Sequence, residues 1–226
     1  MAEKEKNDGI SEIQEAISKT ELFIEKYKKV IVYVIIGIVL VACLVFLFNK
    51  YYVQPRNNDA QNQMLKGQEY FEADMFKEAL EGDGKDYIGF AEIADDYSLT
   101  KSGNAANAYA AICNYKLGKY SEAIEFGKEF DGNGDINLSV VINGLIGDSY
   151  VNLNQYADAH KYFAKAYETN NEAFAALYLK KDGEVYEAEK NFDKAIELYN
   201  KIKNEFPQSG EAQDIEKYIE RATLSK

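Results

Sequence analysis

The chain has 226 residues and a formal net charge of −12, from 38 acidic and 26 basic side chains. Nucleic-acid phosphates and anionic lipid head groups repel such a chain, so we expect neither nucleic-acid binding nor peripheral adhesion to a membrane. The sequence has two cysteines, two prolines and no tryptophan, but 18 tyrosines. Few prolines and abundant helix-forming residues predict a mostly helical protein.

The tail, residues 1–29, carries apolar side chains at the spacing of a heptad seam. The seam steps by three and four residues through Ile10, Ile13, Ile17, Thr20, Ile24 and Tyr27. Acidic side chains lie early in the tail and basic ones lie late, as the helix macrodipole favours. The pattern predicts an amphipathic helix, which either packs on a partner helix or rests on a membrane surface.

Residues 30–48 form a run of 19 residues without a charged side chain. As a helix this run is roughly 28 Å long, close to the thickness of about 30 Å of a bilayer core. Tyr27, Tyr51 and Tyr52 flank the run at the depth where aromatic side chains anchor membrane helices. The run therefore predicts a single transmembrane helix rather than a buried helix of a soluble domain.

Two alternatives to a permanent anchor arise from the same run. A cleaved secretory signal has an apolar core of roughly 7–15 residues, which this run exceeds. A lipoprotein signal would use residues 40–43, Leu-Val-Ala-Cys, as a lipobox with Cys43 as the lipidated residue. A lipobox closes an apolar run, whereas this run continues to Phe48. We therefore expect an uncleaved anchor.

Positive charge gathers on the N-terminal side of the span. Lys26, Lys28 and Lys29 lie directly before it, whereas the basic residues after it are spread out. The positive-inside rule then predicts a cytoplasmic N-terminus. The rest of the chain, after a linker at residues 49–59, is then expected to be exported. In a bacterium with two membranes the span would lie in the inner membrane and the exported part in the periplasm.

The chain after the linker repeats with a period of 36 residues, or 44 between the first two units. A small residue recurs at one position, and an alanine follows it twelve residues later. The pairs are Gly67 and Ala79, Ala111 and Ala123, Gly147 and Ala159, and Gly183 and Ala195. A period of 34 to 36 with two helices per unit is typical of a solenoid, and small residues allow two helices to cross closely.

Aromatic residues keep the same period and are expected to fill the core. They are Tyr70, Tyr150 and Tyr186 on the first helices, and Phe76, Tyr120, Tyr156 and Phe192 at the starts of the second helices. The second unit departs from the pattern, with Asn114 and Gly127 at aromatic positions. The first unit is interrupted after Ala79 by a turn-rich insertion, residues 81–86. The fourth unit is the most regular.

This pattern resembles the tetratricopeptide repeat over residues 60–207, in four units that begin near Ala60, Asn104, Val140 and Ala176. The resemblance implies an all-α fold, in which the transmembrane helix is followed by an α-solenoid of about four helical hairpins. Residues 208–226 are expected to form a C-terminal capping helix. Its apolar stripe consists of Ile215, Tyr218, Ile219 and Ala222.

In tetratricopeptide proteins the first helices line a concave groove that binds peptides, so the resemblance implies such a groove here. Carried onto this chain, its residues include Met64, Gln68, Phe71, Ile112, Tyr115, Asp148, Val151, Lys180, Glu184 and Glu187. This surface is apolar and aromatic with an acidic end, which suits an unfolded or amphipathic segment rather than an acidic tail. Alternatively, these residues bury against a neighbouring chain or against the insertion.

The sequence contains no strong candidate for a catalytic, cofactor-binding or metal-binding residue. His160 has no cysteine or histidine near it in the chain. Residues 131–142 begin like a calcium loop but have Ile136 and Ile142 where that loop needs glycine and glutamate. No nucleophile elbow, phosphate-binding glycine loop or metal-spaced cluster is present in the sequence. We therefore expect no catalytic, cofactor or metal site, and a helix-to-helix turn at residues 131–137.

The order of cytoplasmic tail, one span and exported repeats resembles the YfgM-like family, ancillary subunits of the bacterial Sec translocon. Residues 89–106, including Tyr97, Thr100 and Ala106, especially resemble that family's exit from the first repeat. The resemblance implies a tethered factor that docks or holds newly exported chains, with translocon subunits and exported chains as partners. The tail seam would then contact the translocon or a second copy of the chain. The alternative is a scaffold for another envelope assembly, such as a division, cell-wall or secretion machine, without client handling.

Overall fold

The computed structural model describes residues 2–132, 134–169 and 172–226, and within them the side chains from Glu25 onward except that of Glu172. The protein is 80% helical, and the described residues contain no β-strand. The expected all-α fold is therefore confirmed. The chain divides into two compact units, residues 1–55 and 56–226, which we call the anchor unit and the repeat domain.

The anchor unit consists of α1 (Ala2–Phe48), a π-helical turn (Asn49–Val53) and the first residues of α2 (Gln54–Glu72). Among the residues whose structure is described, one helical stretch, Glu25–Glu72, is long and apolar enough to cross a membrane, and none of its most apolar window is buried. Water disfavours such a contiguous exposed apolar surface, which marks a membrane or partner contact. The boundary of the two units at Pro55 falls inside the expected linker.

The predicted tail seam lies on α1, whose helical backbone begins at Ala2. The side chains of Ile10, Ile13, Ile17 and Ile24 are outside the described residues. The seam therefore stays a prediction.

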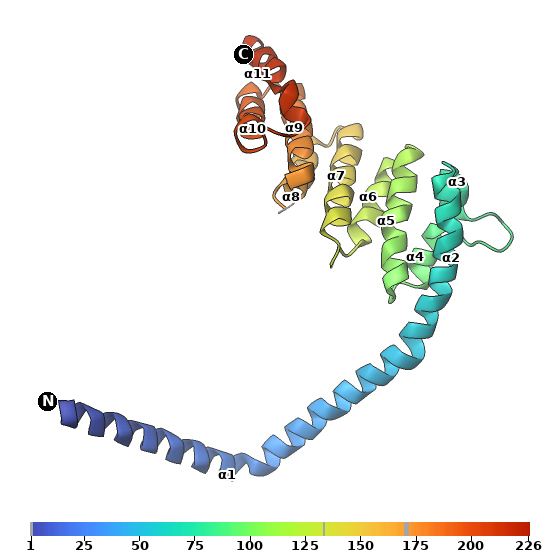
Figure 1. Ribbon diagram of the computed structural model, residues 1–226. Helices are drawn as coiled ribbons and strands as arrows, with labels where there is room; N and C mark the ends of the chain where they lie inside the picture. Colours follow the sequence, from blue (N-terminus) through green and yellow to red (C-terminus); the bar gives the residue numbers. More distant parts are fainter. Residues whose placement is uncertain (1, 133, 170–171) are drawn as a thin grey trace. The chain divides into compact units, whose positions relative to one another are not determined.

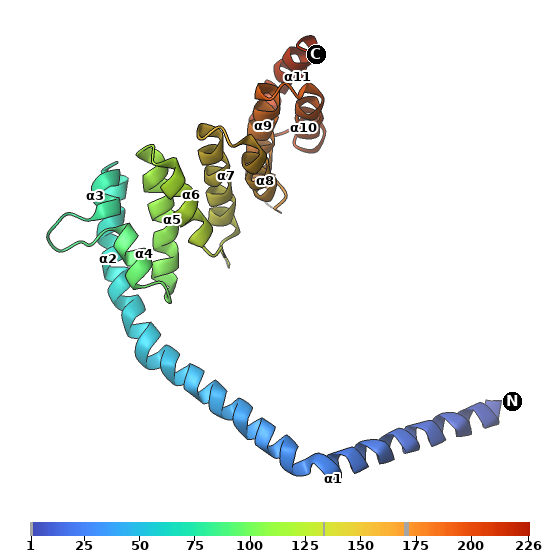
Figure 2. The same ribbon diagram turned by 180° about the vertical axis from the view of Figure 1, so that it is seen from behind.

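The repeat domain is a succession of helical hairpins. After α2 come α3 (Phe76–Glu81), α4 (Phe90–Asp96), α5 (Lys101–Lys116), α6 (Tyr120–Glu129), α7 (Ile136–Asn152), α8 (Tyr156–Tyr167), α9 (Glu172–Ala188), α10 (Phe192–Glu205), a 3-10 turn (Glu211–Gln213) and α11 (Ile215–Leu224). Within this domain the hairpins follow one another in chain order, from α2 to the red α11 (Figures 1 and 2). In the later hairpins α5, α7 and α9 pack on their own second helices α6, α8 and α10, and α5 contacts α7 as α7 contacts α9.

Each hairpin turns through the same local structure. The residue seven positions after the small repeat residue has a left-handed backbone in all four units. These residues are Asp74 (φ 56°), Gly118 (φ 74°), Asn154 (φ 56°) and Lys190 (φ 62°). The next backbone N–H bonds to the carbonyl five residues earlier, for example Gln155 to Tyr150 at 2.9 Å. This pattern satisfies carbonyl groups that the end of a helix leaves unpaired.

In the third and fourth hairpins the small repeat residue lies against an aromatic ring of the second helix. A Cβ added to Gly147 would lie 2.7 Å from the ring of Phe163, and one added to Gly183 would lie 2.4 Å from the ring of Tyr199. The sequence pattern paired these glycines with Ala159 and Ala195. The alanines are fully buried, but the closest atoms belong to the aromatic ring one helical turn later.

The insertion supplies the first hairpin with aromatic rings from a different part of the chain. The position that holds Phe163 and Tyr199 in later hairpins is Asp83 in the first one. Gly67 instead faces the rings of Tyr87 and Phe90, and the Tyr87 hydroxyl donates to the Ala79 carbonyl at 2.7 Å. The loop between α3 and α4 projects from the side of this hairpin in both views (Figures 1 and 2).

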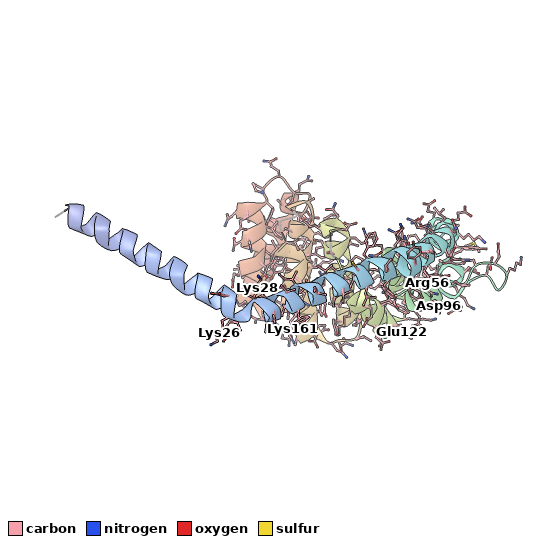
Figure 3. The ribbon with its side chains drawn as sticks, turned by 90° about the horizontal axis from the view of Figure 1, so that it is seen from below. Lys26, Lys28, Arg56, Asp96, Glu122 and Lys161 are labelled. Carbon is pink, nitrogen blue, oxygen red and sulfur yellow. The ribbon has the colours of Figure 1, made fainter. Side chains whose placement is uncertain are left out.

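The start of the repeat domain is fixed to α4 by Arg56. Its guanidinium donates to the backbone carbonyl of Asp96 and lies 5.0 Å from the ring centroid of Tyr97. Figure 3 shows the two labelled residues, Arg56 and Asp96, together. A charge-assisted bond combined with a cation–π contact stabilises the first turns of α2 against the rest of the domain.

The C-terminal helix α11 packs on α10 and closes the solenoid. Ile215 and Ala222 are buried, and Tyr218 and Ile219 are partly buried against them. The predicted apolar stripe is therefore present, although within residues 208–226 the helix α11 begins only at Ile215, after a 3-10 turn.

Candidate functional site

Two surface clefts lie along the first helices of the repeat domain. The N-terminal cleft, about 520 Å³, lies between α2 and α5, and the C-terminal cleft, about 350 Å³, lies between α7, α8 and α9. The residue directly after the small repeat residue lines both of them. It is Gln68 in the N-terminal cleft, and Asp148 and Glu184 in the C-terminal cleft. Equivalent repeat positions thus form both hollows.

The N-terminal cleft combines amide side chains with an apolar floor. Met64 is buried and Leu65 is exposed at its edge. Gln68 donates from Nε2 to the Tyr109 hydroxyl at 3.0 Å, and Asn57 accepts the backbone N–H of Ser102 at 3.1 Å. These bonds connect α2 with α5 and fix the two walls. The cleft can accept both backbone groups and apolar side chains of an extended chain.

The C-terminal cleft combines an ion pair with aliphatic side chains. Lys181 of α9 donates from Nζ to Asp148 of α7, with a separation of 2.5 Å. Val151, Val185 and Ala188 contribute the apolar lining. Burial raises the pKa of the Asp148 carboxyl, and the bond to Lys181 opposes that rise. Asp148 is therefore a partly desolvated carboxylate that requires a cation nearby.

Phe71, Ile112 and Tyr115 of the expected groove line neither cleft and are half-buried. The Phe71 ring lies edge-on to Tyr109 at 5.2 Å, and the Tyr115 ring lies 5.6 Å from Tyr120. Ile112 and Tyr115 pack against the same core cluster. These three side chains therefore contribute to packing inside the domain as well as to its surface.

Residues of the C-terminal segment form contacts with two of the expected groove residues, Lys180 and Glu187. Lys180 pairs with Asp214 at 3.3 Å, and its ammonium lies 4.2 Å from the ring centroid of Tyr218. Glu187 accepts two bonds from Arg221, at 2.8 and 2.9 Å. Both residues therefore stabilise the closed end of the solenoid, where α11 covers part of the fourth hairpin.

His160 belongs to a polar cluster around the buried Asp182, which the sequence pattern did not reveal. Its Nδ1 lies 2.5 Å from Asp182 and its Nε2 lies 2.7 Å from Glu189, while its ring stacks on Tyr186 at 3.7 Å. Asp182 is 1% exposed and also accepts a bond from Tyr167. Asp182, Tyr186 and Glu189 are spaced along one face of α9, which is the only signal of the cluster in the sequence.

The remaining candidates for chemistry have structural roles. Burial raises the pKa of the Cys113 thiol to about 12, so this thiol is not ionised at neutral pH. Asp135, in the loop that begins like a calcium site, accepts the backbone N–H of Leu138 at 2.9 Å and caps α7. Among the described residues, His, Cys, Asp and Glu form no group of three or more that could hold a metal ion.

Comparisons with known proteins support the repeat assignment. A family model described as "Tetratricopeptide repeat" matches residues 145–210, which span most of the third and fourth hairpins. No curated protein matches the chain. Together with the four hairpins, the family match supports a tetratricopeptide repeat protein with a helix able to cross a membrane, and this class of repeat implies protein–protein interaction.

Proposed function

We propose that the protein is a membrane-anchored binding protein that takes up polypeptide segments on the first-helix face of its repeats. The observation that carries the proposal is the recurrence of one repeat position in two clefts, as Gln68, Asp148 and Glu184. Hollows at equivalent repeat positions present similar surfaces along a solenoid. An extended chain fits such a series better than a compact small molecule does.

We further propose that the protein is an ancillary subunit of the Sec translocon in a bacterial inner membrane, with the repeats in the periplasm. The support is the resemblance carried by the order of tail, span and repeats and by residues 89–106. In that segment Thr100 caps α5 by accepting the backbone N–H of Gly103 at 3.0 Å. Tethering raises the local concentration of the repeats near emerging chains, so weak contacts suffice.

Protease accessibility tests the membrane arrangement. A protease added to the periplasmic side of intact inner membranes is expected to digest the repeat domain and to spare residues 1–29, because Lys26, Lys28 and Lys29 retain the tail in the cytoplasm. Immunoblots with antibodies against each end measure the fragments. A repeat domain that is protected until the membrane is opened would contradict this orientation. Loss of fatty-acid labelling on Cys43→Ser would instead support the lipoprotein alternative.

Site-specific photo-cross-linking tests client binding. A photoreactive amino acid at Gln68 or Val151, which line the two clefts, is expected to form adducts with newly exported chains. The same group at Glu122, exposed on α6, is the matched control and should give several-fold fewer adducts. Adducts are identified by immunoprecipitation and mass spectrometry. A fixed set of folded envelope proteins at the cleft positions would favour the scaffold function over client handling.

A further inference from the structure

The C-terminal cleft already holds one cation. Lys181 reaches from α9 across the cleft to Asp148 on α7, and its side chain is 33% exposed. The lysine stem lies along the cleft that Val151 and Val185 also line. The cleft thus already binds a basic side chain of the protein itself: the aliphatic stem of the lysine lies along the wall, and its ammonium group pairs with a carboxylate.

The same cleft contains a second carboxylate without a cation of its own. Glu184 lies one helical turn after Lys181 and lines the cleft. Among the described residues Glu184 forms no ion pair, because the basic side chains around it are bound elsewhere. Lys180 pairs with Asp214, Lys181 with Asp148, and Arg221 with Glu187. Glu184 is exposed, so a cation from outside the domain can reach its carboxylate. Desolvation raises its pKa, and the nearby positive charges of Lys180, Arg221 and Lys181 oppose that rise.

We infer that the C-terminal cleft takes one arginine or lysine side chain of a bound polypeptide, with aliphatic neighbours on either side. The stem lies against Val151 and Val185, and the cationic group is held by Glu184 and, in competition with Lys181, by Asp148. This inference rests on the proposed binding of polypeptides and specifies which residue of the segment is recognised. A cleft of about 350 Å³ is at the lower end of the range for ligand pockets, about 300–1,000 Å³, which suits one or two side chains.

Matched peptides test the inference with the full-length chain in non-ionic detergent micelles. Three short fluorescent peptides share leucine and valine neighbours and carry a central arginine, citrulline or glutamate. Citrulline keeps the shape of arginine but lacks its charge, so the pair isolates the ionic contribution. Fluorescence anisotropy is expected to show binding of the arginine peptide at least about ten-fold tighter than that of the citrulline peptide, and weaker binding still of the glutamate peptide.

Variants of the cleft give expected changes of opposite sign. Lys181→Met removes the competing cation and should tighten arginine-peptide binding by about three-fold to ten-fold, a gain that misfolding cannot produce. Glu184→Gln should reduce the preference for arginine over citrulline to near one. Glu168→Gln, which removes one exposed negative charge outside the cleft, is the control for the general attraction of an acidic protein and should leave the preference unchanged.

Two results would overturn the inference. Equal affinity for the arginine and citrulline peptides would show that the cleft does not read the charge, while cross-linking of clients at Val151 could still support polypeptide binding. Unchanged or weaker binding of the arginine peptide by Lys181→Met would show that Asp148 does not contribute. Absence of binding by all three peptides, together with absence of cross-linked clients, would contradict the proposed function itself.

Discussion

Replacement of His160 by alanine is expected to lower the free energy of unfolding of the repeat domain by about 3 kcal/mol, because it leaves the buried Asp182 carboxylate with the bond from Tyr167 but without the imidazole. Asp182 is 1% exposed, and His160 Nδ1 lies 2.5 Å from it. The imidazole also connects α8 to Glu189 and stacks on Tyr186. Urea unfolding of the full chain in micelles, followed by circular dichroism, measures the loss.

The pH dependence of the His160→Ala variant distinguishes charge from packing. Burial raises the pKa of Asp182, and His160 opposes the rise. Without His160 the pKa rises further, so the folded variant binds a proton at a pH where the unfolded chain has released it. The stability of the variant therefore increases as the pH falls through that raised pKa, and its deficit is larger at neutral than at mildly acidic pH.

Two further variants complete the His160 test. Asp182→Asn in the His160→Ala background should recover part of the lost stability, because it removes the buried negative charge. Lys161→Ala changes the next residue of α8, whose surface pair with Asp158 should contribute less than about 1 kcal/mol. A His160→Ala loss no larger than that of Lys161→Ala, or a deficit independent of pH, would contradict the assigned role of His160.

The regular hairpins could be predicted from the sequence because their determinants are local. The second helices begin at Phe76, Tyr120, Tyr156 and Phe192, where the aromatic period placed their starts. The left-handed turn residue and the helix-end hydrogen bonds follow from residues within about seven positions of the small repeat residue. Because the same local pattern recurs in several units, each unit gives further evidence for the same helical hairpin.

The first hairpin could not be predicted in the same way, because its core uses contacts that the repeat pattern does not contain. The insertion displaces the aromatic position, and Tyr87 and Phe90 fill the space over Gly67. In the second hairpin the vacancy left by Gly127 is filled by Ile146 of the following hairpin. In both cases a side chain from another part of the chain fills the space of the missing ring, and the sequence of the hairpin itself does not indicate which side chain this is.

In the candidate site, too, the local repeat features could be predicted and the long-range contacts could not. Gln68, Asp148 and Glu184 could be located because they share one repeat position, and the structure places all three in clefts. Lys180 and Glu187 share the face of the fourth hairpin, but α11 engages both through Asp214 and Arg221, which lie 34 residues away in the chain. The docking of a terminal helix is a long-range contact, so the repeat pattern alone does not reveal it.

The close approach of the helices in the last hairpin leads to the other large expected effect. Gly183→Val is expected to destabilise the repeat domain by about 3 kcal/mol, because a Cβ there would lie 2.4 Å from the ring of Tyr199, which is fully buried and cannot withdraw. The Tyr199 hydroxyl donates to Glu187 at 2.6 Å, and Glu187 binds Arg221. Movement of this ring therefore loosens α11 as well. Urea unfolding of the full chain measures the change.

Gly210→Val is the matched control for this prediction, because a Cβ at Gly210 meets no atom within 4 Å and its φ of −60° suits any residue. Its effect should stay within about 0.5 kcal/mol, as for ordinary surface substitutions. Combining Gly183→Val with Tyr199→Leu should recover part of the loss, since the smaller side chain vacates the space that valine needs. Equal effects of the Gly183 and Gly210 changes, or no recovery in the double variant, would show that ring contact does not explain the glycine at this repeat position.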